Sequence, residues 1–349
     1  MHLNSVPFLL FLVSGIFCQF DYDGYYPSEA DYGYAPSMFG PSTAVCAPEC
    51  TCPISYPTAM YCDNLKLKSL PILPSGIKYL YLRNNMLDSL DEKSFDNVTD
   101  LEWLILDNNY LENSKIKGKV FAKLKNLKKL HINYNNLTEV VGPLPNTLDD
   151  LQLANNKINK VNPNSLEGLV NLTIIHLQHN QLTEDTLSGV FKGLNSLVYL
   201  DLSFNKLSKL PLGMPPNLLM LYFDNNQITK IPDEYFQHLK VLQFLGLSHN
   251  KLSDSGIPGN PFNISSLVEL DLSYNQLKSI PTVNEHLENY YLQVNQINKF
   301  PVSSFCKVVG VLAYSRIRHL RLDANNLTRA DLPNEMYNCL RLASEISVD

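Results

Sequence analysis

The chain has 349 residues, of which 45% are hydrophobic, and its 34 acidic residues outnumber its 28 basic ones, for a formal net charge of −6. This charge disfavours nucleic acid as a partner, because a phosphate backbone is bound by a basic surface. No stretch approaches the roughly 20 consecutive apolar residues that a membrane-spanning helix needs, so we expect no membrane span.

Residues 1–18 are predicted to be a signal peptide. An apolar run extends from Val6 to Phe17, which is too short to cross a bilayer, and we place the cleavage after Cys18. The last residues, 344–349, provide no hydrophobic tail for a lipid anchor. We therefore expect a freely secreted protein.

Residues 19–45 form an acidic, tyrosine-rich segment that we expect to be disordered. The segment carries four carboxylates and no Lys or Arg, so it accounts for most of the net negative charge. Tyrosines beside acidic residues favour sulfation during secretion, which would turn the segment into a polyanion for basic partners. The alternative is an unmodified acidic tail. The candidate sulfotyrosines are Tyr22, Tyr25, Tyr26, Tyr32 and Tyr34.

Six cysteines remain after the predicted cleavage, an even number that favours disulfides in a secreted protein. The segment 46–76 contains Cys46, Cys50, Cys52 and Cys62. Cys306 and Cys339 lie in the segment 306–349. Both groups lie where a repeat array would expose the ends of its core, so we predict that they fasten terminal caps. Zinc is the alternative for the first group, although its spacing differs from paired C-x2-C knuckles. Four cysteines allow three pairings, and the spacing does not choose among them.

Residues 77–305 repeat the pattern L-x-x-L-x-L-x-x-N-x-L, with a last copy in the segment 306–349. The eleven copies start at Ile77, Leu101, Leu127, Leu148, Leu172, Leu197, Leu218, Leu242, Leu267, Leu287 and Ile317. Every copy has Asn at its ninth position, where the amide can bond buried main-chain groups, so we assign these asparagines a structural role. Prolines between the copies favour extended chain over helix. We predict an α/β-type leucine-rich-repeat solenoid with a curved parallel β-sheet on the concave face. The convex face should be mostly polyproline, 3₁₀ and loop segments.

The cysteine cluster, the short-long-long rhythm of the turns, the long penultimate turn holding Cys306 and the acidic tyrosine-rich tail together resemble the class II small leucine-rich proteoglycans. Further similar text is Cys46-Ala-Pro-Glu-Cys50, Tyr79-Leu-Tyr-Leu-Arg-Asn-Asn85, Leu101 through Asn109, and Ile257-Pro-Gly-Asn260. The resemblance covers essentially the whole chain. It implies the disulfides Cys46–Cys52 and Cys50–Cys62 in the first cap, and Cys306–Cys339 closing an "ear" at the other end.

N-x-S/T sequons predict N-glycosylation at Asn97, Asn136, Asn171, Asn263 and Asn326. The resemblance implies that the first four carry oligosaccharides that can be extended to keratan sulfate, whereas it does not cover Asn326. Plain, unsulfated N-glycans are the alternative. The tail contains no Ser-Gly pair, so we do not expect the chondroitin or dermatan chains of decorin-like relatives.

The third, fifth and seventh positions of each repeat should face the concave side, where they carry aromatic and acidic residues. Such residues serve no core and are typical of an interaction surface. A collagen triple helix, a rigid rod with outward side chains, suits a long curved surface of this kind. The predicted collagen contacts are Tyr199, Asp201, Tyr222, Asp224, Glu269 and Asp271. For Asp201 and Asp271, both in L-D-L-S, the alternative is that they only bond laterally along the sheet.

Two basic clusters could hold sulfated glycans or an acidic partner, with a solvated charged face as the alternative. They comprise Lys123, Lys125, Lys128, Lys129 and His131, and Arg316, Arg318, His319 and Arg321. Pairs such as Ser248-His249 follow from the repeat, and the sequence contains no nucleophile elbow, H-E-x-x-H or Gly-rich phosphate loop. We therefore expect no enzyme activity and no cofactor.

Together these features predict a secreted matrix proteoglycan that binds fibrillar collagen and regulates fibril diameter and spacing. The resemblance connects such proteins with connective tissue and corneal transparency. The alternative is a soluble recognition module for growth factors or innate-immune ligands, although receptors of that kind usually carry a four-cysteine C-terminal cap. A homodimer through the concave face would compete with collagen for the same surface.

Overall fold

The computed structural model describes residues 46–348 except 233 and 311–312. The predicted signal peptide and the acidic tail with its candidate sulfotyrosines lie outside the described residues. Among the described residues no helix has the length and apolar character to cross a membrane.

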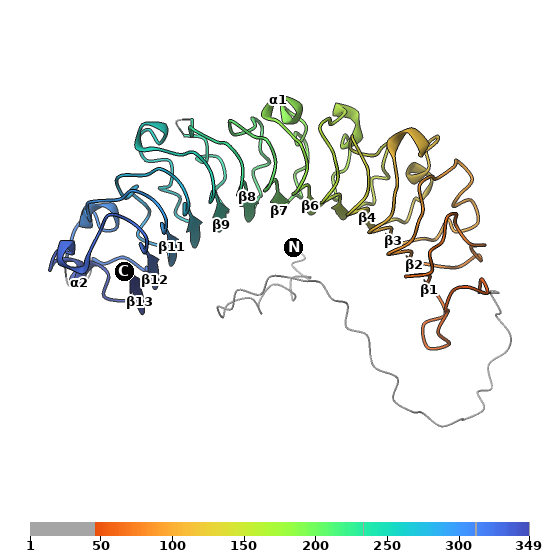
Figure 1. Cartoon of the computed structure of the whole chain (residues 1–349), viewed down its shortest axis with the longest axis horizontal. Helices are drawn as coiled ribbons and strands as arrows, with labels where there is room; N and C mark the ends of the chain where they lie inside the picture. Colours follow the sequence, from red (N-terminus) through yellow and green to blue (C-terminus); the bar gives the residue numbers. More distant parts are fainter. Residues whose placement is uncertain (1–45, 233, 311–312, 349) are drawn as a thin grey trace, which may run out of the picture. The chain divides into compact units, whose positions relative to one another are not determined.

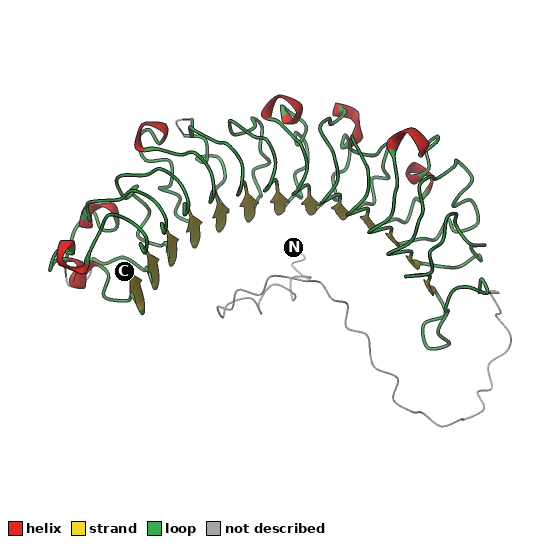
Figure 2. Ribbon diagram, in the orientation of Figure 1, coloured by secondary structure: helices red, strands yellow, loops and turns green. Residues whose placement is uncertain are grey.

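Thirteen short strands, each of three residues, line the inner side of an arc (Figures 1 and 2). Within the described part of the chain they form one sheet in sequence order, and every neighbouring pair is parallel. The strands are β1 (Ala59–Tyr61), β2 (Tyr79–Tyr81), β3 (Trp103–Ile105), β4 (Lys129–His131), β5 (Asp150–Gln152), β6 (Ile174–His176), β7 (Tyr199–Asp201), β8 (Met220–Tyr222), β9 (Phe244–Gly246), β10 (Glu269–Asp271), β11 (Asn289–Tyr291), β12 (His319–Arg321) and β13 (Glu345–Ser347).

The outer side of the arc is mostly loop, with short helical turns (Figure 2). Its α-helices are α1 (Glu184–Leu187) and α2 (Met336–Cys339). The 3₁₀ turns are Asn113–Lys115, Phe121–Lys123, Pro163–Ser165, Asp254–Gly256, Val302–Ser304 and Arg329–Asp331. These elements confirm the predicted solenoid, with its parallel sheet on one face and little helix on the other.

The repeated apolar residues form one continuous core inside the arc. In the turn that contains β3, Leu101, Leu104, Leu106 and Leu111 are fully buried. Their side chains contact the equivalent residues of the neighbouring turns, so each turn completes the core of the next. Truncating one of them to Ala should cost about 2–5 kcal/mol.

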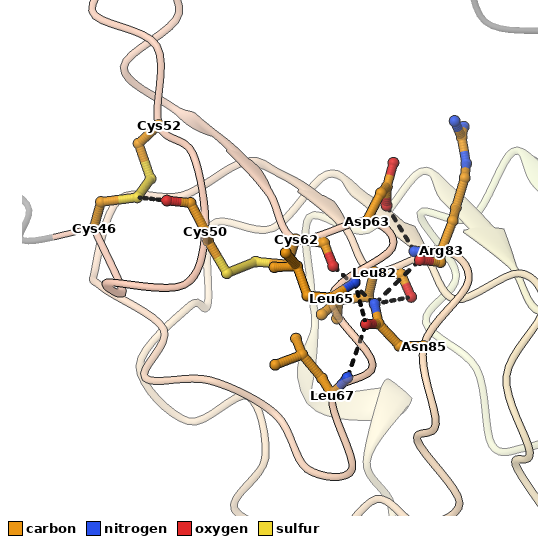
Figure 3. Close-up of a disulfide and its surroundings, with 10 residues drawn as sticks. All are labelled: Cys46, Cys50, Cys52, Cys62, Asp63, Leu65, Leu67, Leu82, Arg83 and Asn85. Atoms are coloured by element: carbon orange, nitrogen blue, oxygen red, sulfur yellow. Dashed lines mark hydrogen bonds between the residues drawn. A yellow bond between two sulfur atoms is a disulfide. The ribbon is translucent and has the colours of Figure 1, made fainter.

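The asparagine at the ninth position connects each turn to the one before it. Asn109 Nδ2 donates to the carbonyls of Leu82 and Leu106 at 2.9 and 3.0 Å, while its Oδ1 accepts from the N–H of Leu87 at 3.0 Å. Figure 3 shows the same arrangement at Asn85, which bonds Cys62 in the cap and Leu82 in its own turn. The side chain thus satisfies main-chain groups that the three-residue strands leave unpaired.

We call the asparagine at the ninth position of each repeat the ladder asparagine. The residue before each ladder asparagine adopts a left-handed backbone conformation, although none of these residues is glycine. Asn84 and Asn108 have φ of 55° and 54°, and bulkier residues do the same, with Phe204 and Tyr274 both at 53°. Asparagine tolerates this region well, whereas aromatic residues rarely adopt it. The bend that ends each strand therefore imposes the left-handed conformation even on residues whose own backbone preference disfavours it.

Both ends of the sheet extend beyond the eleven sequence repeats. Strand β1 pairs with β2, and Cys62 and Leu65 take the places of the sixth-position leucine and the ninth-position asparagine. At the other end, β13 pairs with β12. Each terminal cap therefore adds one strand to the eleven that the sequence repeats supply.

Disulfides fasten both ends of the array. The structure joins Cys46 to Cys52 and Cys50 to Cys62 in the first cap (Figure 3), which is the pairing that the resemblance implies. A third bond connects Cys306 to Cys339, across the turn that contains β12. All six sulfurs of the described cysteines are therefore used in disulfides.

Candidate functional site

The concave face is built from three columns of side chains supplied by successive strands. The parallel register aligns residues that occupy the same repeat position, such as Asp201, Tyr222 and Asp271 at the fifth position. The buried leucines alternate with these residues along each strand and hold the backbone against the core. The side chains at the third, fifth and seventh positions of each repeat therefore determine which groups this face presents.

The six predicted contact residues lie on or directly after β7, β8 and β10, within four adjacent strands. We call Tyr199, Asp201, Tyr222, Asp224, Glu269 and Asp271 the acidic patch. All six are half-buried. The rings of Tyr199 and Tyr222 lie 5.7 Å apart, so the patch combines a pair of aromatic rings with four carboxylates.

The carboxylates of the acidic patch differ in whether their hydrogen bonds stay within one turn or connect two turns. Asp201 and Asp271 accept from Ser203 and Ser273 within their own turns, at 2.9 and 2.8 Å. Two other carboxylates bond a neighbouring turn: Asp224 Oδ1 accepts from the N–H of Ser248 at 2.7 Å, and Glu269 Oε2 accepts from Asn289 Nδ2 at 3.1 Å. The alternative in which Asp201 and Asp271 only bond laterally along the sheet is not supported, because both carboxylates accept their hydrogen bond at the bend of their own turn.

Gly246 creates a notch at the centre of the acidic patch. It lies in register between Tyr222 and Asp271, at a position where other turns carry a side chain. A Cβ on this glycine would lie 2.2 Å from Oδ2 of Asp224 and 2.8 Å from the ring of Tyr222. The missing side chain thus gives the Asp224 carboxylate its place on the concave face. Gly246 is not among the residues that were predicted from the sequence.

Burial and mutual repulsion favour the neutral form of the carboxyl groups in the acidic patch. Burial, together with the nearby charge of Asp271, raises the pKa of Asp224 to about 7. Burial also raises the pKa values of Asp201, Glu269 and Asp271. Burial removes part of the hydration of a carboxylate. A cation that approaches the carboxylate stabilises its ionised form in place of the lost water. The patch is therefore suited to Lys or Arg side chains of a partner.

The middle of the concave face holds a second titratable cluster, on β4, β5 and β6. His131 Nε2 lies 3.1 Å from Oδ2 of Asp150, and Lys129 Nζ lies 3.9 Å from the same oxygen. Burial works to raise the pKa of Asp150, but the hydrogen bond and charge of His131 outweigh it, and the pKa is lowered. Burial lowers the pKa of His176, whose ring lies 4.7 Å from that of Tyr199. The charged groups of this cluster contact one another, so they are less available to a charged partner than those of the acidic patch.

Aromatic rings dominate the face near the first cap. Tyr61 and Tyr81 are stacked at 4.7 Å, and Tyr79 meets Trp103 edge to face at 5.1 Å. The ammonium of Lys129 lies 4.6 Å from the centre of the Trp103 ring. The concave face therefore changes along the arc, from aromatic and basic to acidic.

Most members of the two basic clusters contact acidic groups of the chain itself. Lys123, Lys128 and Lys129 pair with Asp96, Glu102 and Asp150. At the other end of the arc, Arg318 pairs with Glu288, His319 lies 3.6 Å from Glu345, and Arg321 binds Asp323 through two nitrogens. The clusters are thus largely neutralised, which favours the solvated charged face over a site for an acidic partner.

The sequon asparagines all reach the surface to some degree. Asn97, Asn171 and Asn326 are exposed, and Asn136 and Asn263 are half-buried. In Asn136 and Asn263 the amide oxygen accepts a hydrogen bond, from Lys157 Nζ at 2.7 Å and from Asn284 Nδ2 at 2.9 Å respectively. These bonds use Oδ1 rather than Nδ2, the atom to which a glycan would be attached.

Two stacked ring pairs border the concave face, and sequence reasoning missed both. His179 stacks on Phe204 at 3.9 Å, and His249 stacks on Tyr274 at 3.8 Å. All four residues occupy the left-handed eighth position, so the rings of neighbouring turns align. The recurrence of aromatic residues and histidine at this position was the available signal.

The chain matches family models for leucine-rich-repeat proteins. The leucine rich repeat N-terminal domain matches residues 45–74. Leucine rich repeat models match residues 74–111, 145–182 and 212–252, and also 196–218 and 266–287. Fold and surface therefore define a leucine-rich-repeat protein with a disulfide-bonded N-terminal cap.

Full-length relatives identify the family more closely. Lumican of Coturnix japonica is 77% identical over 349 residues, which are 100% of both chains. Fibromodulin of Homo sapiens is 47% identical over 308 residues, 88% of this chain and 81% of that protein. The chain belongs to the lumican family, which comprises small leucine-rich proteoglycans of the extracellular matrix.

A solved structure has the same architecture. A chain from an octameric complex of Latrophilin 3, Unc5D and FLRT2 aligns with a TM-score of 0.68 and 26% identity, covering 85% of this chain and 82% of that one. In that complex the leucine-rich repeats belong to FLRT2. The likeness extends over most of both chains, so it concerns the solenoid as a whole and not a single turn.

Proposed function

We propose that this protein binds fibrillar collagen through the acidic patch and thereby limits the lateral growth of fibrils. The observation that carries the proposal is the clustering of four carboxylates and two tyrosine rings on or just after β7, β8 and β10, with the pKa of Asp224 raised to about 7. Half-buried carboxylates of this kind favour Lys and Arg, and half-buried tyrosine rings provide contact area with little loss of side-chain entropy.

The geometry of the partner supports the same proposal. A triple helix presents its side chains outward along a rigid rod and offers no pocket. A shallow, extended sheet with charges on successive strands can follow such a rod over several turns. Docking would cover part of the fibril surface and block the addition of further collagen molecules, which sets fibril diameter.

Glycans would add spacing to this steric effect. We place N-linked oligosaccharides on Asn97, Asn136, Asn171, Asn263 and Asn326, and keratan sulfate extension on the first four. Hydrated anionic chains repel one another, so they would hold neighbouring fibrils apart. Sulfation of the tyrosines in the tail would supply further negative charge for basic partners. In this account the protein is secreted and non-catalytic.

The runner-up is a soluble recognition module for growth factors or innate-immune ligands. The similarity to a chain from a multiprotein complex favours it, because the same architecture serves protein recognition there. The two functions differ in outcome, since a matrix organiser changes collagen assembly whereas a recognition module shows saturable binding to a soluble protein.

The deciding experiment is collagen fibril assembly with the enzymatically deglycosylated core protein. Turbidity and fibril diameter by electron microscopy should be compared for the wild type, Asp224→Asn and Tyr222→Ala, with Glu167→Gln, an exposed residue between β5 and β6, as the control. We expect thinner fibrils with the wild type and the control, and loss of the effect in both patch variants. Thin fibrils with all four proteins would place the collagen site elsewhere, and unchanged fibrils with all four would favour the recognition module.

A further inference from the structure

A hollow of about 380 Å³ lies on the flank of the arc, beside the turns that contain β2 to β4. One side is formed by Met86, Tyr110 and Asn136, which occupy the tenth position of three successive turns. The opposite side is charged, with Lys115 contacting Asp88 at 3.0 Å and Glu112 at 3.3 Å. Its volume falls in the range of small-molecule sites, roughly 300–1,000 Å³.

Asn136 is both a wall of this hollow and the acceptor of the sequon Asn136-Leu137-Thr138. Lys157, in the following turn, donates from Nζ to Oδ1 of Asn136 at 2.7 Å. Because an ammonium can only donate, this bond fixes which branch of the amide is the oxygen. Nδ2 is the other branch of the amide, and Asn136 and Tyr110, which lies in the preceding turn, line the same hollow.

Tyr110 offers an apolar surface at this place without serving the core. It is 54% exposed, and Met86 in the turn before it is 41% exposed. The C–H face of a sugar ring packs well on such a surface, and its hydroxyls need donors and acceptors nearby. The charged groups of Asp88, Glu112 and Lys115 supply these across the hollow.

We propose that the first sugars of an N-glycan on Asn136 lie in this hollow, with one ring stacked on Tyr110. The inference rests on the proposed glycosylation and specifies the path of one chain. The tenth position follows the ladder asparagine, whereas the acidic patch uses positions before it. The glycan therefore runs along the flank and leaves the concave face open to a partner.

Asn326 provides an internal comparison. It occupies the same tenth position and also begins a sequon, but the residue in front of it is Gln296, to whose carbonyl Asn326 Nδ2 donates at 3.4 Å. Replacing Tyr110 by Gln therefore gives Asn136 the kind of neighbour that Asn326 has. Tyr110→Phe keeps the ring and removes only the hydroxyl.

The test uses the full chain secreted from mammalian cells and digested, without denaturation, by a peptide N-glycosidase. Glycopeptide mass spectrometry measures occupancy and the release rate at each site. We expect release at Asn136 to be on the order of fivefold slower in the wild type and in Tyr110→Phe than in Tyr110→Gln, as one aromatic contact would produce. Release at Asn97 should be the same in all three, as should thermal unfolding, since Tyr110 lies outside the core.

Equal release rates at Asn136 in the wild type and Tyr110→Gln would overturn the inference and leave the proposed glycosylation intact. An unoccupied Asn136 beside an occupied Asn97 would overturn the inference together with the proposed glycosylation of Asn136, and leave that of Asn97 intact. If neither these sites nor Asn171 and Asn263 carried glycan, the proposed glycosylation itself would fail.

Discussion

The pH dependence of collagen binding should report directly on Asp224. Its pKa is raised to about 7 by burial and by the charge of Asp271. A basic partner binds the ionised carboxylate, and the ionised fraction rises from about one tenth at pH 6 to about nine tenths at pH 8. If ionisation of Asp224 is required, affinity for collagen should increase about tenfold over this interval. Asp224→Asn keeps the acceptor for the Ser248 N–H but removes the charge, so its affinity should be lower and nearly independent of pH.

Stability should change in the opposite direction. A carboxyl whose pKa is raised on folding contributes stability that is present below its unfolded pKa and is lost as the pH rises through its folded pKa. Relative to Asp224→Asn, the wild type should therefore lose stability between pH 6 and pH 8 while it gains affinity. Surface plasmon resonance on immobilised collagen fibrils at fixed ionic strength, with urea unfolding in the same buffers, measures both. An equal gain in affinity in Asp224→Asn, or weaker binding at the higher pH, would refute the reasoning.

Three further outcomes follow from the fold. Asn250→Ala strands the N–H of Ile228 and removes one of the two side-chain hydrogen bonds to the carbonyls of Phe223 and Leu247, and it should cost about 1–3 kcal/mol in urea unfolding; an unchanged midpoint would contradict the structural role of the ladder. Gly246→Ala should displace the Asp224 carboxylate and reduce collagen affinity toward that of Asp224→Asn with an unchanged circular dichroism spectrum, and retained affinity would show that the notch is unimportant. Replacing Cys306 and Cys339 together by Ser should cost about 2–5 kcal/mol, measured by thermal unfolding against the oxidised wild type; an unchanged transition would contradict its role in fastening the cap.

Much of the fold could be predicted because the repeat specifies it locally. Each leucine at positions such as Leu101 and Leu104 has one geometry that buries it, and the ladder asparagine marks where the strand must end. The strand of the first cap could not be recognised from the repeat, because Leu65 stands where the ladder asparagine would be. The caps could be placed from their cysteines, whereas their pairing came from a family resemblance rather than from spacing.

The candidate site was predictable in composition but not in detail. The period of two along a strand places Tyr222 and Asp271 on the concave side, and the register then brings them together. Asp224 bonds the next turn, whereas Asp201 bonds its own. This difference could not be predicted from the sequence, because hydrogen bonding depends on differences in distance of a few tenths of an ångström. The role of Gly246 could be recognised only in the structure, where the Asp224 carboxylate occupies the space that a side chain at position 246 would need.

The central claim is that the strands β7 to β10 contact collagen, and a site-specific photocross-linker tests it most directly. Phe244, half-buried on the concave face between Met220 and Glu269, can be replaced by p-benzoylphenylalanine, which keeps the phenylalanine ring and adds a photoreactive benzoyl group at its para position. Leu212, 64% exposed in the segment between β7 and β8, serves as the control position. Irradiation with collagen should cross-link the protein from position 244 and not from position 212. Cross-links from position 212 alone would contradict the account.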